Sequence, residues 1–179
     1  MAEGHRAGEV IQRIRQLVSK GVPRKGPVDI NTVVRDILPL VRSELRHHDV
    51  SLTLRLADDL PPVRGDRVQL QQVVLNLVMN AVQAMASVSD RPRELAIRSW
   101  PLSDDEVLIR VQDTGIGIAA DHLSELFSAF FTTKPGGMGM GLSICRSIVE
   151  AHGGAMWATP NAPYGAMFHF SLPVDRGGD

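Results

Sequence analysis

Two glycine-rich turns are the residues of this 179-residue chain whose spacing points to a specific chemistry. The first, residues 113–118 (DTGIGI), follows an apolar strand-like stretch, and the second, residues 137–143 (GMGMGLS), opens an apolar helical pattern. Glycine lets the backbone approach a ligand closely, and the free N–H groups at a helix start attract anions. Together the two turns predict a site for a nucleotide phosphate.

A row of amide side chains is the second chemical feature. Apolar spacing predicts a long helix up to Met85, and on its polar side Gln72, Asn76 and Asn80 are four residues apart, with Gln83 one turn further. Asparagine is disfavoured inside helices because its amide competes for backbone hydrogen bonds. An Asn oxygen is a hard ligand suited to Mg²⁺, which bridges phosphate oxygens. Metal and phosphate contact is therefore one interpretation of the row, and a solvated face or a buried amide network is the other.

The elements that must position these residues alternate between helical and strand-like patterns. Helices are expected at 8–20, 31–48, 66–85 and 142–152, with a short helical piece at 121–127, and strands at 50–56, 94–100, 106–112, 155–158 and 167–172. Asn31 is expected to cap the second helix and Pro39 to bend or shorten it, and Asp66 with Gln69 resembles a capping box. Helices segregated from a largely antiparallel sheet predict an α+β two-layer sandwich, in which a mixed sheet packs on about three helices.

Composition excludes several function classes. A net charge of -1 gives no field for binding nucleic acid, and no apolar stretch approaches the roughly 20 residues of a membrane span. Cys145 is the single cysteine, so no internal disulfide is possible and a small core residue is its expected role.

Two prolines and two glycines within residues 21–27 predict a linker, so residues 1–26 are separated from a main domain at 27–175 and a tail at 176–179.

Two common nucleotide folds do not fit these motifs. The dinucleotide-binding fingerprint expects an early strand–helix–strand unit, whereas these glycines follow long helices and a hairpin. No Gly-Lys-Ser or Gly-Lys-Thr of a Walker motif occurs either. A third nucleotide-binding fold is required.

Residues 28–174 resemble the catalytic, ATP-binding domain of two-component sensor histidine kinases, a member of the superfamily that includes the gyrase, Hsp90 and MutL ATPases and shares the Bergerat-type ATP-binding fold. Four motifs occur in the family order. Residues 71–81 look like the N box, 113–117 like the first glycine box, 127–134 like the F box, and 137–142 like the second glycine box.

The resemblance implies a role for each matching residue. Asn80 would bind Mg²⁺ through its side-chain oxygen, Asn76 would lie beside the triphosphate, and Asp113 would accept a hydrogen bond from the adenine amino group. Lys134, in a lid over the nucleotide, would meet the γ-phosphate, with a solvated loop lysine as the alternative. The full set of implied nucleotide contacts comprises Asn76, Asn80, Gln83, Asp113, Gly115, Gly117, Ile118, Phe131, Thr132, Thr133, Lys134, Gly137, Gly139, Met140, Gly141 and Leu142; Asn76, Asn80 and Lys134 carry the catalytic roles, and Asn80 is the metal ligand.

Four positions depart from the family pattern. Asn76 stands where the ATPase relatives have a glutamate that activates water, so direct ATP hydrolysis is expected to be slow. Gln83 replaces a frequent Lys or Arg, Ala166 a frequent Thr, and Ala129 a frequent Pro.

The phosphoacceptor histidine of the family is the main absence. None of the six histidines lies in an apolar helical pattern ahead of an acidic residue and well before the N box, so surface or structural roles are expected for them. Residues 8–20 look like the end of the second dimerisation helix. The sequence therefore predicts a fragment that binds Mg·ATP and transfers the γ-phosphate to a histidine on another domain, for onward transfer to a response regulator.

The expected partners are accordingly ATP or ADP, a histidine-bearing phosphotransfer domain of the same parent protein and a response regulator. Nucleic acid is not expected, and the fragment is expected in the cytoplasm and outside the membrane, although its parent could be anchored there. Three alternatives stay open at this point: an anti-sigma-factor type serine kinase of the same superfamily, a non-catalytic nucleotide-binding module, and a domain that binds no nucleotide.

Overall fold

Alternating side chains give the strands of this protein one apolar face. In β4 (Arg93–Pro101), Leu95, Ile97 and Ser99 are buried on one side of the strand. In the neighbouring β5 (Glu106–Asp113), Val107, Ile109 and Val111 are buried in the same way. This period of two residues is typical of a sheet that packs on one face only.

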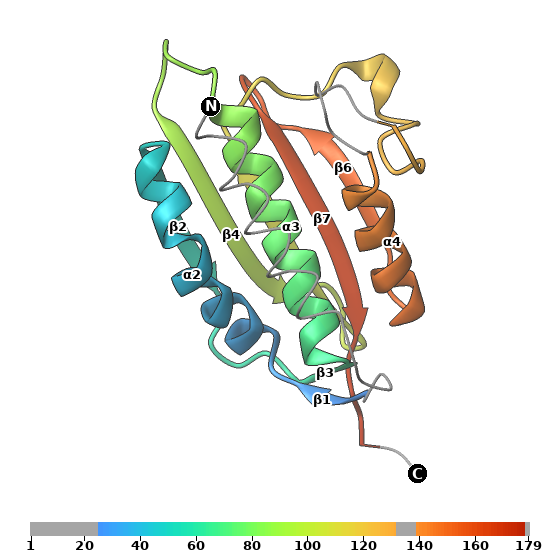
Figure 1. The fold of residues 1–179 in the computed structure, drawn as a ribbon. Coiled ribbons are helices and arrows are strands. Elements are labelled where there is room, and N and C mark those ends of the chain that lie inside the picture. Colours follow the sequence, from blue (N-terminus) through green and yellow to red (C-terminus); the bar gives the residue numbers. More distant parts are fainter. Residues whose placement is uncertain (1–24, 132–138, 178–179) are drawn as a thin grey trace.

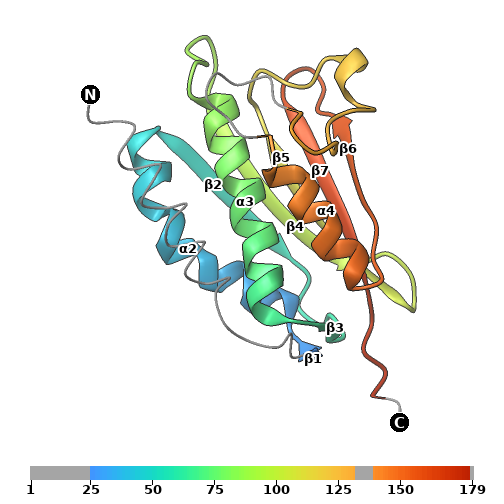
Figure 2. The same ribbon diagram turned by 45° about the vertical axis from the view of Figure 1, so that its right-hand side comes forward.

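The computed structural model describes residues 25–131 and 139–177 and shows two layers, a sheet and three helices (Figures 1 and 2). The five-stranded sheet has the order β2–β4–β5–β7–β6, in which β2 and β4 are parallel and all other neighbours are antiparallel. Besides β4 and β5, its strands are β2 (Val50–Leu56), β6 (Met156–Pro160) and β7 (Ala166–Pro173). Two further strands, β1 (Gly26–Val28) and β3 (Val63–Gly65), form a small antiparallel pair. The predicted α+β sandwich is confirmed.

Helices α2 (Ile30–His47), α3 (Arg67–Met85) and α4 (Gly141–Ala151) cover the apolar face of the sheet. The middle helix, α3, is the most deeply buried, and its core residues are Leu70, Val73, Val74, Leu75, Leu77, Val78, Ala81, Val82 and Met85. Helix α3 packs against both α2 and α4. None of the described helices is long and apolar enough to span a membrane.

The start of α2 differs from the sequence prediction. The cap is Asp29, whose carboxylate accepts hydrogen bonds from the N–H groups of Asn31 and Thr32, so the prediction of Asn31 as the cap was wrong. Asn31 is instead buried, where its amide donates to Ala57 O at 2.7 Å and accepts from the Ser99 hydroxyl at 2.6 Å. Pro39 does not shorten the helix, which continues through it to His47.

The start of α3 is capped as predicted, with one exchange of partner. The Asp66 carboxylate accepts from the N–H groups of Val68 and Gln69. The N–H of Asp66, which a reciprocal capping box would direct to the Gln69 side chain, donates to His152 Nε2 at 2.9 Å. Because His152 Nδ1 also lies 2.7 Å from Ile148 O, the neutral imidazole links the end of α4 to the start of α3. The structural role expected of this histidine is confirmed.

Other differences are confined to short elements. The helical piece expected at 121–127 is reduced to the 3₁₀ turn Ala120–His122, and the two strands β1 and β3 were not predicted. The helix expected at 8–20, and with it the linker up to residue 24, lies outside the described residues.

Candidate nucleotide-binding site

The second half of α3 lies between the two glycine turns. At its C-terminal end, the N–H of Ile116 donates to Ala84 O at 3.1 Å, which fastens the first turn to the helix. Two turns earlier, a side-chain carbon on Gly141 would lie only 2.9 Å from Asn76 Nδ2, so the start of α4 rests directly on Asn76. Asn80 lies between these two contacts on the same helix. The structure therefore brings the predicted amide row and both predicted glycine turns together.

Asp113 is the last residue of β5 and is almost fully buried, with 2% of its surface exposed. One carboxylate oxygen, Oδ1, accepts from the N–H of Gly115 at 2.8 Å, which fixes the orientation of the side chain. A buried carboxylate is a strong acceptor because its surroundings have a low dielectric constant. Asp113 is thus an oriented hydrogen-bond acceptor at the base of the first glycine turn.

A second loop braces the backbone around Asp113. Asn161 donates from its side-chain nitrogen to Asp113 O at 2.8 Å and receives a hydrogen bond from Gln112. Gly165 has a φ of +94°, and a side-chain carbon there would lie 1.9 Å from Asp113 O. Only glycine allows this approach. Gly117 packs beside the same glycine, and the predicted contact Ile118 is half-buried against the core.

Arg91 also holds the first glycine turn in place. Its Nε donates to Thr114 O at 3.0 Å and its Nη2 donates to Gly115 O at 2.9 Å. The guanidinium carbon also lies 4.1 Å from the centre of the Tyr164 ring, which extends the brace to the loop of Asn161. Sequence reasoning missed Arg91 and Asn161, because a bracing side chain in a loop leaves no periodic signal.

The second glycine turn leads into α4. Gly139 O accepts a hydrogen bond from the N–H of Phe130 at 3.0 Å, so the two ends of the intervening segment meet. Met140 precedes the helix, Gly141 is its first residue, and the half-buried Leu142 packs on the core. No side chain among the described residues caps this helix start. Its N–H groups are therefore donors suited to an anion.

The amide row is divided between two environments. Asn76 is half-buried and donates to Cys145 Sγ at 3.1 Å, and burial raises the pKa of that thiol to about 11, opposed by the Asn76 hydrogen bond. Asn80 is half-buried within α3, and its side chain makes no hydrogen bond to another described residue. Gln83 is exposed. Of the two interpretations of the row, Asn76 fits partly with a buried amide network, whereas Asn80 keeps an amide oxygen available for a ligand.

The F box is described only in part. Phe127 packs against the core, Phe130 is 76% exposed, and the half-buried Phe131 lies edge-on to His122 with 5.3 Å between the ring centres. Thr132, Thr133, Lys134 and Gly137 lie outside the described residues.

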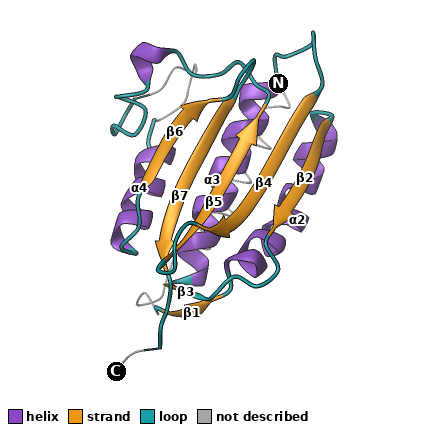
Figure 3. Cartoon of the chain, turned by 180° about the vertical axis from the view of Figure 1, so that it is seen from behind, coloured by secondary structure: helices purple, strands orange, loops and turns teal. Residues whose placement is uncertain are grey.

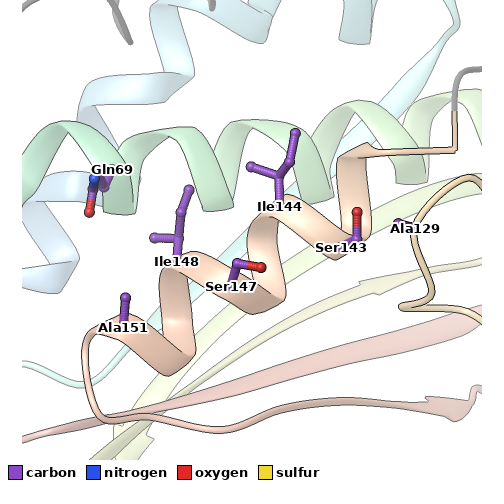
Figure 4. Close-up of a pocket in the computed structure, with 7 residues that line it drawn as sticks. All are labelled: Gln69, Ala129, Ser143, Ile144, Ser147, Ile148 and Ala151. Atoms are coloured by element: carbon purple, nitrogen blue, oxygen red, sulfur yellow. The ribbon is translucent and has the colours of Figure 1, made fainter.

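An open groove of about 410 Å³ lies between α3 and the outer side of α4 (Figure 4). Its lining consists of Gln69, Ala129, Ser143, Ile144, Ser147, Ile148 and Ala151. None of these residues belongs to the predicted nucleotide contacts. Ser143, however, is the last residue of the second glycine turn and Ala129 lies in the F box, so the groove adjoins the candidate site at the start of α4.

A metal at this site would depend on the nucleotide. Nowhere in the described ranges do three His, Cys, Asp or Glu side chains gather as a metal site requires. An available amide oxygen on Asn80 fits Mg²⁺ that is held mainly by phosphate oxygens and water, which is the manner in which Mg²⁺ is commonly bound with nucleotides.

Comparison with known proteins identifies the family of this fold. The model of the histidine kinase-, DNA gyrase B-, and HSP90-like ATPases matches residues 65–176, which contain the two glycine turns, the amide row and Asp113. The chain belongs to this ATPase family. An ATPase domain of this kind binds ATP.

The relatives place the chain among histidine kinase catalytic domains. The catalytic domain of histidine kinase ThkA superposes with a TM-score of 0.74 at 31% identity, covering 84% of this chain and 96% of that one. The sensor protein FixL of Bradyrhizobium diazoefficiens is 44% identical over 94% of this chain and 33% of its own length. For the sensor histidine kinase TmoS of Ectopseudomonas mendocina the identity is 40%, over 96% of this chain and 18% of TmoS. The chain thus spans a third or less of these two curated relatives.

Proposed function

We propose that this chain is the catalytic part of a sensor histidine kinase and transfers the γ-phosphate of ATP to a histidine on a dimerisation domain of the parent protein. The observation that carries the proposal is the meeting of Asp113, the Asn76–Asn80 row and the α4 start along one helix seam. Family membership supports the ATP part of the proposal.

The adenine base is assigned to Asp113. Its carboxylate is held by Gly115 N–H and is suited to accept from the exocyclic amino group of adenine. Guanine presents a carbonyl oxygen at that position, which a carboxylate repels. Asp113 therefore selects ATP over GTP, and Arg91 and Asn161 keep the surrounding backbone in place.

The phosphates are assigned to the turn from Gly139 to Leu142. The N–H groups at the start of α4 and the helix dipole favour negative charge there. Asn76 lies against Gly141 and would flank the phosphates, and Asn80 would supply an oxygen to Mg²⁺. The metal, when bound with ATP, neutralises charge on the phosphate oxygens.

Catalysis in this arrangement consists of positioning. The residues hold ATP so that an imidazole from another domain can attack the γ-phosphorus in line with the departing ADP oxygen. Asn76 is an amide and cannot take a proton from water, so hydrolysis stays slow and the phosphate is reserved for the histidine. The contacts predicted for Thr132, Thr133, Lys134 and Gly137 stay predictions.

The proposed partners are a histidine-bearing phosphotransfer domain, which residues 8–20 would join, and a response regulator. In support, the complex of histidine kinase ThkA with response regulator protein TrrA contains a chain that matches 97% of this one, with a TM-score of 0.74 and 28% identity. We place the domain in the cytoplasm, where ATP is available.

The experiment combines this chain with γ-labelled ATP, Mg²⁺ and a separate dimerisation domain from a sensor histidine kinase. Acid-labile label on the histidine of the added domain is expected, together with little release of inorganic phosphate and no stable label on this chain. Acid-stable label on a serine of a partner would instead indicate a serine kinase. ATP binding without any transfer would indicate a non-catalytic module.

A further inference from the structure

Three arginines, a histidine and a tryptophan form a row across the outer face of the sheet, away from the nucleotide site. The register of the strands places Arg55 of β2, Arg98 of β4 and Arg110 of β5 directly beside one another. His169 of β7 and Trp157 of β6 complete the row across all five strands. Paired residues of neighbouring strands point to the same face, with about 4.8 Å between strands. We call these five residues the arginine row.

The positive charges of the arginine row are not balanced by carboxylates of the described residues. No carboxylate of the described residues forms an ion pair with any of its three arginines. The buried side-chain nitrogens without a hydrogen-bond partner among the described residues are Arg98 Nε, Arg110 Nε and His169 Nδ1, all three in this row. Like charges directly opposite one another destabilise a sheet. The described residues therefore supply no negatively charged group that accepts hydrogen bonds from the arginines of the row.

Aromatic rings frame the row. Trp157 is 36% exposed and stacks on His169 with 5.3 Å between ring centres and a 5° interplanar angle. The Arg110 guanidinium carbon lies 5.2 Å from the centre of the Trp100 ring. Burial, and secondarily Arg110, lowers the pKa of His169, so the positive charge of the row resides on the three arginines at neutral pH.

The face is open in the described part of the chain. All three described helices lie on the opposite side of the sheet, as Figure 3 shows. The first 24 residues carry five Lys or Arg (6, 13, 15, 20 and 24) against two Glu (3 and 9), so their charge does not complement the row.

We propose that the arginine row is a docking surface for an acidic helix of another protein domain. In a helix, carboxylates at i, i+4 and i+8 are about 6 Å apart along the axis, which suits arginines on adjacent strands about 4.8 Å apart. Such a helix would lie across the strands, with its carboxylates on Arg55, Arg98 and Arg110 and an apolar side chain on Trp157. Arg–carboxylate pairs at a partly desolvated surface are short and strong.

The boundaries of the row favour a helix over a broad polyanion. The adjoining row on the same face is uncharged, with Thr53, Ala96, Gln112, Met167 and Thr159 across the strands. Beyond it, Glu94 lies four residues from Arg98, and Glu106 lies four residues from Arg110 on the other side. At about 3.3 Å per residue these carboxylates stand about 13 Å from the row. A membrane surface or a long nucleic acid would meet them, whereas a single helix fits between them.

The test uses a fluorescent, alanine-based 20-residue helical peptide with Glu at every fourth position, and a control peptide with Gln at those positions. Binding to this chain is measured by fluorescence anisotropy at physiological salt. Saturable binding of the Glu peptide is expected, with at least about tenfold weaker binding of the Gln peptide. The Arg98→Gln/Arg110→Gln double variant should weaken binding at least about tenfold, whereas Arg42→Gln on α2, on the opposite layer, should change it less than about twofold.

Affinity for Mg·ATP, measured in parallel, reports on the fold and should be unchanged in every variant. Should the double variant fail to fold, Arg55→Gln at the exposed edge strand replaces it, with an expected weakening of about threefold. Equal binding of the two peptides, or no binding up to about 1 mM, would overturn the proposal. The proposal would also be overturned if the same arginines were required to bind anionic vesicles or single-stranded DNA while the Glu peptide did not bind.

Discussion

Replacing Arg91 with methionine tests whether the first glycine turn must be braced to bind ATP. Methionine keeps an extended side chain but removes the donors to Thr114 O and Gly115 O and the contact with Tyr164. A hydrogen bond from a charged group contributes roughly 1.5 to 3 kcal/mol, and an exposed cation–π contact about 0.5 to 1 kcal/mol.

Water offsets part of this loss. Thr114 is half-buried and Tyr164 is half exposed, so water can replace some of the lost donors. We therefore expect a net loss of about 2 kcal/mol, which is the free energy that binding would have to supply to order the turn again. At about 1.4 kcal/mol for each factor of ten, Mg·ATP affinity should fall by about 10- to 30-fold.

Arg93 offers a matched control. Its guanidinium donates to Val88 O, His48 O and Ala86 O, so Arg93→Met also removes a brace on backbone carbonyls, but one that does not touch the glycine turn. The assay is calorimetric titration of Mg·ATP, with the melting temperature of each variant measured beside it. Both variants should have a lower melting temperature than the wild type, and only Arg91→Met should bind ATP more weakly. An unchanged affinity in Arg91→Met, or an equal loss in Arg93→Met, would refute this reasoning.

Three further predictions concern the scaffold. His152→Phe keeps a ring but removes the Nε2 that accepts from Asp66 N–H and the Nδ1 contact with Ile148 O, which still accepts from the backbone N–H at position 152. Urea unfolding should show a loss of about 1 to 3 kcal/mol in unfolding free energy with ATP affinity unchanged, and a loss below about 0.5 kcal/mol would contradict the link between α3 and α4. Because Cys145 is fully buried and burial also raises the pKa of its thiol to about 11, a thiol reagent at pH 8 should label the folded chain only as fast as the protein opens, and immediate labelling would contradict the buried position. Asp29→Ala should cost about 1 kcal/mol at neutral pH through loss of the cap. Burial opposes ionisation of Asp29, but hydrogen bonds from Thr32 and Asn31 lower its pKa overall. The stabilisation by the ionised cap is therefore present above about pH 4 and is lost as the pH falls through the lowered pKa. A difference in unfolding free energy between wild type and Asp29→Ala that persists unchanged at about pH 2 would disprove this.

The helices and most strands were predictable because apolar periodicity marks each of them. The pattern from Leu70 to Met85 defined α3, and alternation defined β4 and β5. The parallel pairing of β2 with β4 was not predictable, since alternation alone does not give the direction of a neighbour. The two three-residue strands were too short to carry a period.

Those parts of the candidate site that lie within one sequence motif could be recognised before the structure was known. Asp113, Asn76 and Gly141 were identified from local sequence, and the structure brings them to one seam. Arg91 and Asn161 were not, because their role depends on which loops meet in space.

The arginine row shows the same limit of sequence reasoning. Its members are at positions 55, 98, 110, 157 and 169 and become neighbours only through the register of five strands.

Titration of ATP and GTP into the wild type and Asp113→Asn tests the central claim most directly. Asparagine can still accept from Gly115 N–H, so the variant should fold, but it presents an amide nitrogen where adenine needs an acceptor. With Mg²⁺ present, the wild type should bind ATP saturably and GTP at least about tenfold more weakly, and Asp113→Asn should lose at least about tenfold in ATP affinity at an unchanged melting temperature. Equal binding of ATP and GTP by the wild type, or full ATP affinity in a folded Asp113→Asn variant, would contradict the assignment of adenine to Asp113.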